Sequence, residues 1–327
     1  MSPGLDSFEL EKAVAILKRG GLVAFPTETV YGLGADAGNP DAIRKLYAAK
    51  GRPADHPVIV HLADAAQLTQ WSREITPAAN KLAQRFWPGP LTLILRRTPD
   101  VSDALTGGQD TIALRIPSHP MAHALLVKFG GGIAAPSANR FGHVSATTAQ
   151  HVREEFGASV ELVLDGGQSE VGIESTIVDV TGVQPVLLRP GHISAREIEV
   201  AAGVALASPQ ANSPRAPGTL AAHYAPNTPL LVMEGDLMLE LAATLARQGK
   251  SVAVLARSTL QPLFPGLKWI AAPHPAQAYA HDLYANLRAL DAQGCDAILV
   301  EQLPQQPEWA AVNDRLGRAA AGSRQRP

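Results

Sequence analysis

The chain has 327 residues, of which 46% are hydrophobic and 18% are charged, so it is long enough to bury a sizeable core and to form two domains. Its formal net charge of -2 and its pI near 6.6 argue against a protein that coats nucleic acid through bulk positive charge. The single cysteine, Cys295, excludes an intramolecular disulfide and a thiolate metal cluster, and the lack of a membrane-length apolar window or a basic-then-apolar leader leads us to expect a cytoplasmic protein with no membrane partner.

The first elements expected along the chain are two helices separated by a strand. Apolar residues at helical spacing predict a helix over residues 8–19, and an apolar run predicts a strand over residues 22–25. An Asn-Pro pair is typical of a helix start, and it predicts a second helix over residues 40–49. Lys50 and Arg52 are therefore expected to flank the carboxyl end of this helix.

Seven short apolar runs, several of them bounded by Pro or Gly, are interpreted as buried strands. They cover residues 58–62, 91–95, 111–116, 132–135, 162–164, 175–180 and 186–188. Helical patterns intervene at residues 78–86, 120–129 and 148–156. Residues 1–204 are therefore expected to fold as an α/β domain in which helices flank a twisted mixed sheet.

The composition changes twice in the second half of the chain. Residues 205–228 are rich in Ala, Ser, Pro, Asn and Gly, which is typical of a linker that buries little surface. Residues 229–327 then alternate between strands and helices. Strands are expected at residues 230–233, 252–255, 269–271 and 297–300, and helices at residues 237–248, 276–293 and 309–320. This alternation predicts a smaller, doubly wound, Rossmann-like α/β domain.

Several stretches look like known motifs but lack the spacing that their chemistry needs. Residues 249–251 end like a phosphate-binding loop, yet Thr244 stands where that loop needs glycine. The G-L-G at residues 32–34 lacks the third glycine of a dinucleotide fingerprint and is interpreted as a tight turn. His119 and His123 would share a helix face, but no third metal ligand accompanies them, so we expect no metal held by the protein alone.

Two short polar signatures suit a site for phosphates and a small oxyanion. K-G-R-P at residues 50–53 supplies two cations, and S-A-N at residues 137–139 supplies small hydrogen-bonding side chains after an apolar run. Either signature alone is explained as well by a helix end or a turn. Together they favour chemistry on phosphates.

Six motifs in order along the chain resemble those of the YrdC family. They are P-T-E-T-V-Y-G-L-G at residues 26–34, K-G-R-P at 50–53, W-P-G-P-L-T at 87–92, L-R-I-P at 114–117, A-P-S-A-N at 135–139 and E-S-T-I at 174–177. The H-Y-A-P stretch at residues 223–226 and the domain after it resemble the long two-domain form, whose members are threonylcarbamoyl-AMP synthases. The resemblance covers nearly the whole chain.

This resemblance implies a nucleotidyl-transfer reaction and a place for it in tRNA processing. L-threonine, bicarbonate and ATP would give threonylcarbamoyl-AMP and pyrophosphate. The product would pass to the tRNA threonylcarbamoyl transferase machinery, which modifies an adenosine next to the anticodon. A direct contact between this chain and tRNA is not implied.

The resemblance also implies which residues form the site. The family's catalytic residues correspond to Lys50, Arg52, Ser137 and Asn139. Its threonine-binding residues correspond to Thr29, His61, Arg115, Ala135 and Ser175. Its ATP contacts correspond to Arg52, His56, Thr111, Ser137, Ser145, Arg189 and Tyr224. The family commonly has Asn at the position of His56, so the nucleotide contact at this position differs in chemistry.

The chemistry of each residue type agrees with these assignments. Carbamate attack on the α-phosphate needs no protein nucleophile; it needs positioning and cations that match the developing charge. The planar fork of Arg115 suits the threonine carboxylate, although pairing with a surface carboxylate would also explain an arginine at a strand end. Thr29 and His61 are expected to read the substrate hydroxyl. Mg²⁺ is expected on the phosphates of ATP and not in an all-protein cage.

The linker at residues 205–228 and the overall activity each leave an alternative open. The linker is expected to act as a lid that shields the labile carbamate from water, and the alternative is a passive tether. An RNA-binding module that uses a basic cleft would also bind phosphates, but interleaved aromatic residues are lacking. A related carbamoyl transferase acting on carbamoyl phosphate is the other alternative, although the zinc-finger cysteines of the larger maturation proteins are absent.

Overall fold

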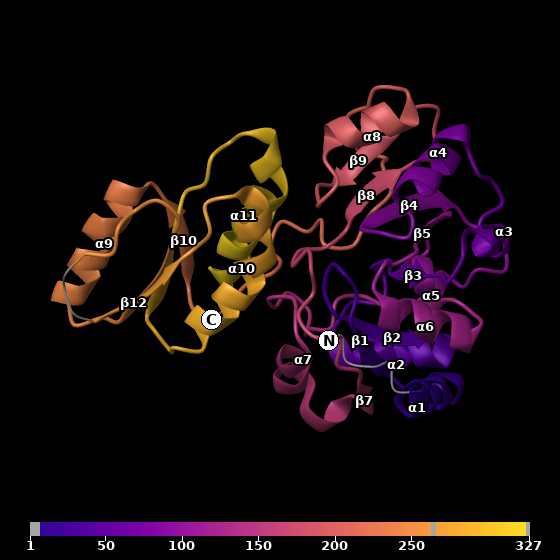
Figure 1. Cartoon of the computed structure of the whole chain (residues 1–327), viewed down its shortest axis with the longest axis horizontal. Helices are drawn as coiled ribbons and strands as arrows, with labels where there is room; N and C mark the ends of the chain where they lie inside the picture. The colour runs from indigo at the N-terminus through magenta and orange to yellow at the C-terminus, as the bar shows by residue number, and fades with distance from the viewer. Residues whose placement is uncertain (1–6, 263–265, 325–327) are drawn as a thin grey trace. The chain divides into compact units, whose positions relative to one another are not determined.

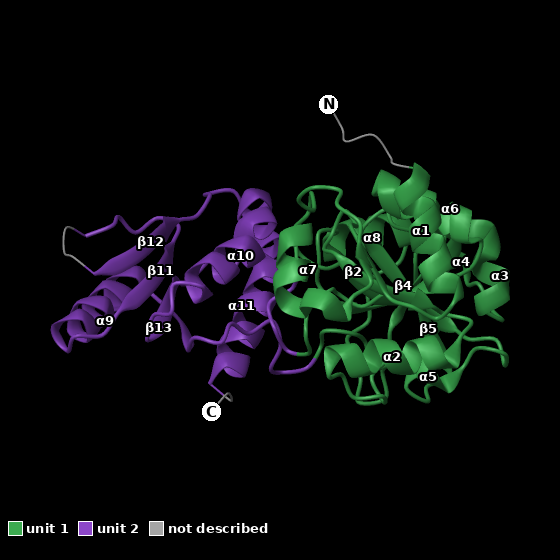
Figure 2. Cartoon of the chain, turned by 90° about the horizontal axis from the view of Figure 1, so that it is seen from below, with its two compact units in different colours: residues 1–141, 146–219 green, residues 142–145, 220–327 purple. Residues whose placement is uncertain are grey.

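A computed structural model describes residues 7–262 and 266–324. The chain forms two compact units, one made of Met1–Phe141 and Ala146–Thr219 and the other of Gly142–Ser145 and Leu220–Pro327 (Figure 2). The change from the first unit to the second at residue 219 falls inside the stretch predicted as a linker, residues 205–228. The first part of that stretch therefore belongs to unit 1.

Unit 1 is built on a mixed sheet, as the sequence predicts. Among the described residues its strand order is β7-β1-β2-β6-β3-β5-β4-β8-β9. The strands are β1 (Val23–Phe25), β2 (Gly32–Asp36), β3 (Ile59–His61), β4 (Leu91–Arg96), β5 (Thr111–Arg115), β6 (Ile133–Ala134), β7 (Leu162–Val163), β8 (Thr176–Asp179) and β9 (Val186–Arg189). Strands β1 and β7, β3 and β5, and β4 and β8 pair in parallel, and the other neighbours are antiparallel.

Helices pack on both faces of this sheet, because alternate residues of a strand point to opposite sides. Ala24 belongs to one buried cluster with residues of α2, α4, α7 and α8, whereas its neighbours Val23 and Phe25 belong to another with residues of α1 and α6. The main helices are α1 (Ser7–Lys18), α2 (Pro40–Lys50), α4 (Pro77–Phe86), α6 (Pro120–Phe129), α7 (Ala149–Phe156) and α8 (Ala195–Ala202). Short helices are α3 (Leu68–Trp71) and α5 (Asp103–Thr106), with one-turn 3-10 helices η1 (Ala65–Gln67) and η2 (Gly157–Ser159) (Figure 1).

The interpretation of residues 32–34 as a tight turn is wrong, because Gly32 begins strand β2. Neither glycine of this stretch has a positive φ. A Cβ at Gly32 would lie 3.1 Å from the Cβ of Ala135, and one at Gly34 would lie 2.9 Å from Cε1 of Phe25. The two glycines therefore serve close packing between neighbouring strands and not a reversal of the chain.

Unit 2 is the small parallel α/β unit that the sequence predicts. Its four described strands run in the order β10 (Leu230–Met233), β13 (Ala297–Glu301), β11 (Val252–Ala256) and β12 (Leu267–Ala271), all in parallel. Helix α9 (Gly235–Arg247) covers β11 and β13, while α10 (Ala276–Asp291) and α11 (Ala310–Ser323) pack against each other and against β11 and β10; the 3-10 turn η3 (Pro307–Trp309) leads into α11. Buried Met238 of α9 packs on Val254 and Leu299 of the sheet.

Candidate functional site

The first polar signature lies at the end of α2, as predicted. Gly51 ends the helix with a left-handed backbone conformation, φ 62°. Lys50 is 3% exposed, and its Nζ donates hydrogen bonds to the backbone oxygens of Ser137, at 2.5 Å, and Asn139. Burial, with a contribution from the Arg52 cation, lowers the pKa of Lys50 well below its usual value. The fold therefore joins the two signatures through Lys50.

Backbone hydrogen bonds fix the second signature. The amide of Leu33 donates to the oxygen of Pro136 at 2.9 Å, and the amide of Ala138 donates to the oxygen of Tyr31 at 2.7 Å. The side-chain amide of Asn139 donates to the oxygen of Arg140 at 2.7 Å. The segment that carries Ser137 and Asn139 is thus held against β2 before any ligand binds.

Arg52 and His56 lie together on the segment that follows α2. Nη2 of Arg52 donates to the oxygen of Pro57 at 2.6 Å, and its guanidinium lies 5.8 Å from the ring centre of Tyr47. The His56 ring meets Phe141 edge to face, with ring centres 5.4 Å apart. Burial and the Arg52 cation lower the pKa of His56, so the imidazole is neutral near pH 7.

Arg115 stands at the centre of a buried group that also contains Glu28, Thr29 and His61; we call it the Arg115 cluster. Arg115 ends β5, and its Nη1 donates to Oγ1 of Thr29 at 2.8 Å while its Nε donates to the oxygen of Gly89 at 3.3 Å. Its Nη2 lies 2.7 Å from Oε1 of Glu28, and these side chains are 4% and 3% exposed. The alternative of pairing with a surface carboxylate is therefore wrong, because the partner is buried.

His61 completes the cluster from the neighbouring strand. It ends β3 and pairs in register with Arg115 of β5. Burial, together with the Arg115 charge, lowers the pKa of His61 to about 3, so the ring is neutral at physiological pH. Oε1 of Glu28 and Nη2 of Arg115 face each other as a buried ion pair, and neither they nor Nδ1 of His61 meet the alignment of a hydrogen bond with a described residue. Buried polar atoms are usually hydrogen-bonded, so the cluster is a candidate site for a polar ligand.

Arg189 connects residues from two of the predicted sets. It is buried at the end of β9, and its guanidinium donates to the backbone oxygen of Ser175 at 2.9 and 3.1 Å and to Oγ of Ser175 at 3.1 Å. Nη1 of Arg189 also donates to the oxygen of Pro217 at 2.9 Å. Oγ of Ser175 lies 2.8 Å from Oγ1 of Thr92, which belongs to the W-P-G-P-L-T motif. Ser175 is therefore held between two motifs.

The predicted residues do not all lie near one another. Thr111 begins β5 and Arg115 ends it, so their Cα atoms are about 13 Å apart along an extended strand. Ala135, which is buried, instead joins β3 through a 3.0 Å hydrogen bond to the oxygen of Ile59. Ser145 and Tyr224 belong to unit 2.

Within unit 2, aromatic and cationic groups surround Tyr224. Its φ is 59°, the one positive value among described residues other than glycine. The ring stacks on Tyr284 with centres 5.7 Å apart, and the guanidinium of Arg315 lies 5.4 Å from its centre. The backbone oxygen of Ser145 accepts a 3.2 Å hydrogen bond from Nε of Arg288. Both predicted residues are therefore fixed within their own unit.

Sequence reasoning missed Glu28, although it lies inside a quoted motif. A carboxylate between two threonines in a stretch of small and apolar residues was the available signal, because such a residue is costly to bury without a cation. Its partner, Arg115, stands 87 positions later at the end of β5, so spacing alone did not connect them.

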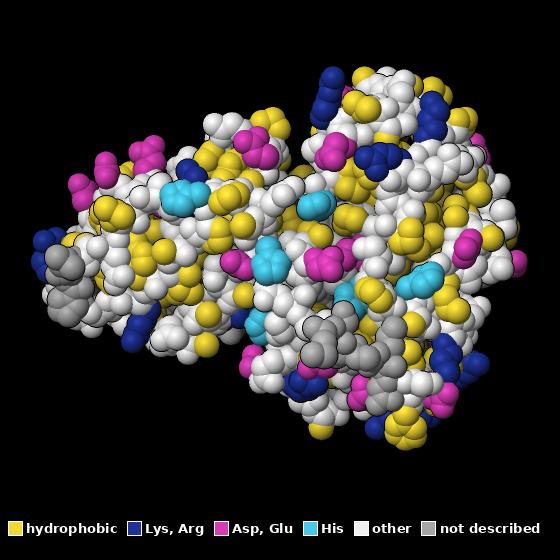
Figure 3. Space-filling model, viewed as in Figure 1, with side chains coloured by type: hydrophobic (Ala, Val, Ile, Leu, Met, Phe, Trp, Pro, Cys, Tyr) yellow, Lys and Arg dark blue, Asp and Glu magenta, His cyan; other side chains and the backbone are white. Residues whose placement is uncertain are grey.

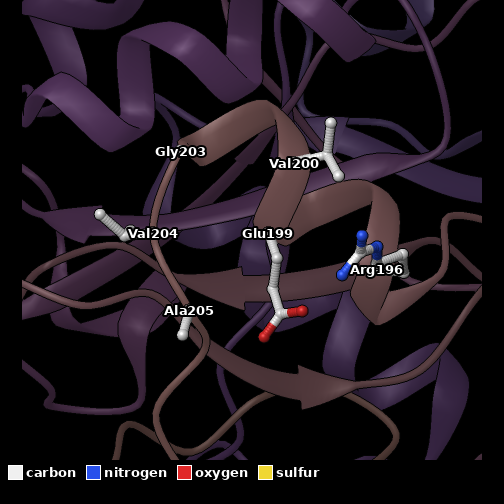
Figure 4. A pocket seen from close by; sticks show the side chains of 6 residues that line it. All are labelled: Arg196, Glu199, Val200, Gly203, Val204 and Ala205. Atoms are coloured by element: carbon white, nitrogen blue, oxygen red, sulfur yellow. The ribbon is translucent and has the colours of Figure 1, made fainter.

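Three further observations concern a pocket, metal binding and membrane insertion. A pocket on α8, lined by Arg196, Glu199, Val200, Gly203, Val204 and Ala205, contains none of the predicted residues (Figure 4). The described residues include no group of three or more His, Cys, Asp or Glu placed to hold a metal ion. Across residues 7–262 and 266–324, we find no helix with the length and apolar character needed to cross a membrane.

The fold and the site define a class: a two-unit α/β protein whose larger unit carries a buried arginine cluster and a separate, lysine-linked polar segment on one sheet. The family model Sua5_yciO_yrdC, described as "Telomere recombination", matches residues 15–191, and the model described as "Threonylcarbamoyl-AMP synthase, C-terminal domain" matches residues 193–321. The chain belongs to the Sua5/YrdC family, in the form that has both domains.

Relatives match along nearly the full length. The threonylcarbamoyl-AMP synthase of Pyrococcus abyssi is 39% identical over 97% of this chain and 95% of the relative, and that of Bacillus subtilis is 40% identical over 96% and 93%. A crystal structure of P. abyssi Sua5 complexed with L-threonine superposes with a TM-score of 0.89 at 38% identity, covering 97% of this chain and 95% of that one. The one-domain E. coli YciO covers 58% of this chain, with a TM-score of 0.51.

Proposed function

We propose that this protein is a threonylcarbamoyl-AMP synthase, which converts L-threonine, bicarbonate and ATP to threonylcarbamoyl-AMP and pyrophosphate. The observation that carries the proposal is the Arg115 cluster, in which a buried arginine fork lies beside Thr29, Glu28 and the neutral ring of His61, in a chain related over nearly its full length to curated synthases. A fork of this kind matches the carboxylate of an amino acid.

The first step is binding of threonine at the Arg115 cluster. The guanidinium of Arg115 is held by Thr29, Glu28 and the backbone of Gly89, so it is oriented before the substrate arrives. Neutral His61 offers a ring nitrogen to the substrate hydroxyl, and valine would leave that nitrogen unpaired. Ser175, fixed by Arg189, is our candidate for a further contact to threonine.

The second step joins the amino acid to the nucleotide. The threonine ammonium first loses a proton to solvent, and the free amine then combines with bicarbonate to give a carbamate and water. A carbamate oxygen then forms a bond to the α-phosphorus of ATP, the bond to the pyrophosphate oxygen breaks, and pyrophosphate leaves with the electron pair. No bond to the protein forms, so the protein contributes positioning and charge.

Residues of the two polar signatures are assigned to this step. Arg52 supplies a cation to the phosphates, while Ser137 and Asn139 orient the carbamate and the α-phosphate. Lys50 is assigned a double role, because its Nζ also holds the backbone of Ser137 and Asn139 in place. His56, Thr111, Ser145, Arg189 and Tyr224 remain assigned to ATP by the family resemblance. Mg²⁺ is proposed to enter with ATP, because this ion usually binds through substrate phosphates with one or two carboxylates and waters.

We further propose that the linker acts as a lid and not as a passive tether. Its first part is already held on unit 1, since the amide of Arg215 donates to Oε1 of Gln109 at 2.6 Å and Pro217 accepts from Arg189. A lid would keep water from the labile carbamate. Cutting the chain near Ala205 should lower synthesis of the intermediate, and unchanged synthesis would contradict the lid.

The decisive assay is pyrophosphate release from ATP and bicarbonate with and without L-threonine. Wild type should require threonine, and Lys50→Ala and Arg115→Ala should each lose most of the activity. Arg196→Ala is the matched control, because Arg196 is an exposed arginine of the α8 pocket and should leave the rate unchanged. Release without threonine, or no loss in either site variant, would overturn the proposal.

The same assay separates the alternatives. A carbamoyl transferase would use carbamoyl phosphate without threonine, and an RNA-binding module would show salt-dependent RNA affinity without ATP turnover. On the face drawn in Figure 3, Lys and Arg are interspersed with Asp and Glu and do not form one basic patch, which supports the enzyme. We also propose that the enzyme works in the cytoplasm and passes its product to the tRNA threonylcarbamoyl transferase machinery.

A further inference from the structure

Glu28 has an unusual position for a buried carboxylate. Its Oε2 accepts a 3.2 Å hydrogen bond from the amide of Ser118, while its Oε1 lies 2.7 Å from Nη2 of Arg115. Oε1 and Nη2 form a buried ion pair whose geometry does not meet the alignment of a hydrogen bond, so the attraction between them is mainly one of charge. Arginine–carboxylate pairs frequently make two parallel hydrogen bonds, and this pair does not.

The pairing sets the charge of the Arg115 cluster. Arg115 contributes one positive charge and Glu28 one negative charge, while His61 is neutral. The cluster is therefore close to neutral before a ligand binds. A ligand with a lone negative charge would meet Arg115 but would leave the buried carboxylate of Glu28 without compensation, whereas a zwitterion brings a carboxylate and an ammonium together.

This balance matters because the proposed reaction surrounds Arg115 with other anions. Bicarbonate, ATP and pyrophosphate each carry negative charge without an ammonium group, and an uncompensated buried arginine would attract all of them. We propose that Glu28 is a positioning and specificity residue, which orients the fork of Arg115 and reserves it for a zwitterionic amino acid over lone anions. This inference rests on the proposed function.

The test compares two ligands by isothermal titration calorimetry on the full chain without ATP. L-threonine is the zwitterion, and 2,3-dihydroxybutanoate is the lone anion, because it has the same carbon skeleton with hydroxyl in place of ammonium. The quantity of interest is the ratio of their dissociation constants. Wild type should favour threonine, and Glu28→Gln, which removes the charge but keeps the shape, should reduce that preference by about tenfold or more.

Two control variants separate charge from shape. Glu28→Asp keeps the charge but withdraws the carboxylate, so both ligands should bind more weakly while their ratio stays within about twofold of wild type. Glu161→Gln removes a carboxylate that pairs with Arg19 and Lys45 and not with Arg115, and it should leave both constants unchanged. Circular dichroism is used before titration to verify that the Glu28→Gln protein is folded.

Each outcome has a defined reading. Equal weakening of both ligands in Glu28→Gln would overturn the inference and leave the synthase proposal intact, because threonine would still bind to wild type. If Glu28→Gln fails to fold, Glu28→Asp decides: a lost preference there overturns the inference, and a retained preference with weaker binding supports it. Absence of threonine binding to wild type would overturn the proposed function itself.

Discussion

The two units each bury a carboxylate beside the end of a strand, and the two carboxylates are satisfied to very different degrees. Glu301 ends β13 in unit 2, and its Oε2 accepts hydrogen bonds from the amides of Arg257, Ser258 and Thr259 at 2.6, 2.8 and 3.1 Å, while Oγ of Ser258 donates to Oε1. Glu28 in unit 1 accepts one backbone hydrogen bond.

The difference in hydrogen bonding indicates that Glu301 has a structural role, whereas Glu28 belongs to a candidate binding site. A carboxylate that accepts three successive amides and one hydroxyl holds the loop after β11 to the end of β13, and both of its oxygens are hydrogen-bonded within the protein. A carboxylate that faces a buried guanidinium without aligned hydrogen bonds leaves polar capacity inside the protein, which costs stability unless a ligand uses it. Unit 2 therefore shows a completed polar centre, and unit 1 an incomplete one.

The largest expected effect comes from changing the arginine of the incomplete centre. Arg115→Lys keeps the charge but cannot contact Thr29, Glu28 and Gly89 at once, so threonine-dependent pyrophosphate release should fall by roughly 100-fold. Arg153→Lys, at an exposed pair with Asp165, is the control and should retain full activity. A loss below about threefold in Arg115→Lys would contradict the role of the fork.

The completed centre should respond in stability and not in binding. Glu301→Ala leaves the amides of Arg257, Ser258 and Thr259 without their acceptor and should lower the free energy of unfolding of unit 2 by about 3 kcal/mol. Urea denaturation measures this loss. Threonine affinity, measured below the transition, should stay within about twofold of wild type. A large loss of threonine affinity would contradict the view that Glu301 stabilises unit 2 without a role in threonine binding.

The two centres also differ in their pH dependence. The pKa of His61 is about 3 in the folded protein and near 6.5 in the unfolded chain, so the unfolded chain binds more protons between these values. Stability should therefore fall as the pH falls from 6.5 towards 3, by up to about 1.4 kcal/mol per pH unit, and His61→Gln should remove this part. Urea denaturation at pH 7 and pH 5 measures the difference.

Glu301 should respond only at more acidic pH. Burial acts to raise its pKa, but the hydrogen bonds from Ser258 and its neighbours prevail, and the net pKa lies below the usual 4.5. Its contribution is present above pH 4.5 and is lost as the pH falls through the folded pKa. Glu301→Gln should therefore flatten the pH dependence below pH 4.5 and leave the range from 5 to 7 unchanged.

The smallest effect is expected at His56, where this chain departs from its family. The ring is half-buried and neutral, and it contacts Phe141 by its edge. Asn offers a donor of similar reach, so His56→Asn should change the KM for ATP by less than about threefold and leave kcat unchanged. Steady-state kinetics of the two proteins at one pH measure this ratio, and an increase of KM well beyond threefold would contradict the equivalence of the two side chains.

Local signals predicted the fold well, and contacts distant in sequence explain what was missed. Asn39 caps α2 by accepting from the amides of Asp41 and Ala42, and this helix was predicted from the Asn-Pro pair. The strand that begins at Gly32 was missed. Its glycines are needed because the side chains of Ala135 and Phe25 leave no room for a Cβ at Gly32 and Gly34. Residue propensity takes account of the glycine itself but not of the side chains that pack against it from neighbouring segments.

The site shows the same division. The family resemblance pointed to Arg115, Thr29 and His61, but the partners of each group depend on which segments meet in the fold. Arg115 of β5 meets Glu28 of the segment between β1 and β2, and Arg189 meets Ser175 across the β8–β9 pair. Sequence periodicity does not show which distant segments come into contact. The chemical role of a residue could therefore be inferred from its type, but its hydrogen-bond and ion-pair partners could not.

Gly51 determines that Lys50 and Arg52 of the K-G-R-P signature make contacts in different parts of unit 1. The left-handed turn at Gly51 changes the direction of the backbone between two cations only two positions apart. Lys50 consequently enters the protein and fastens Ser137 and Asn139, whereas Arg52 turns to Tyr47 and the oxygen of Pro57. No atom lies within 4 Å of a Cβ built at Gly51, so space would admit an alanine, and it is the positive φ of 62° that favours glycine at this position.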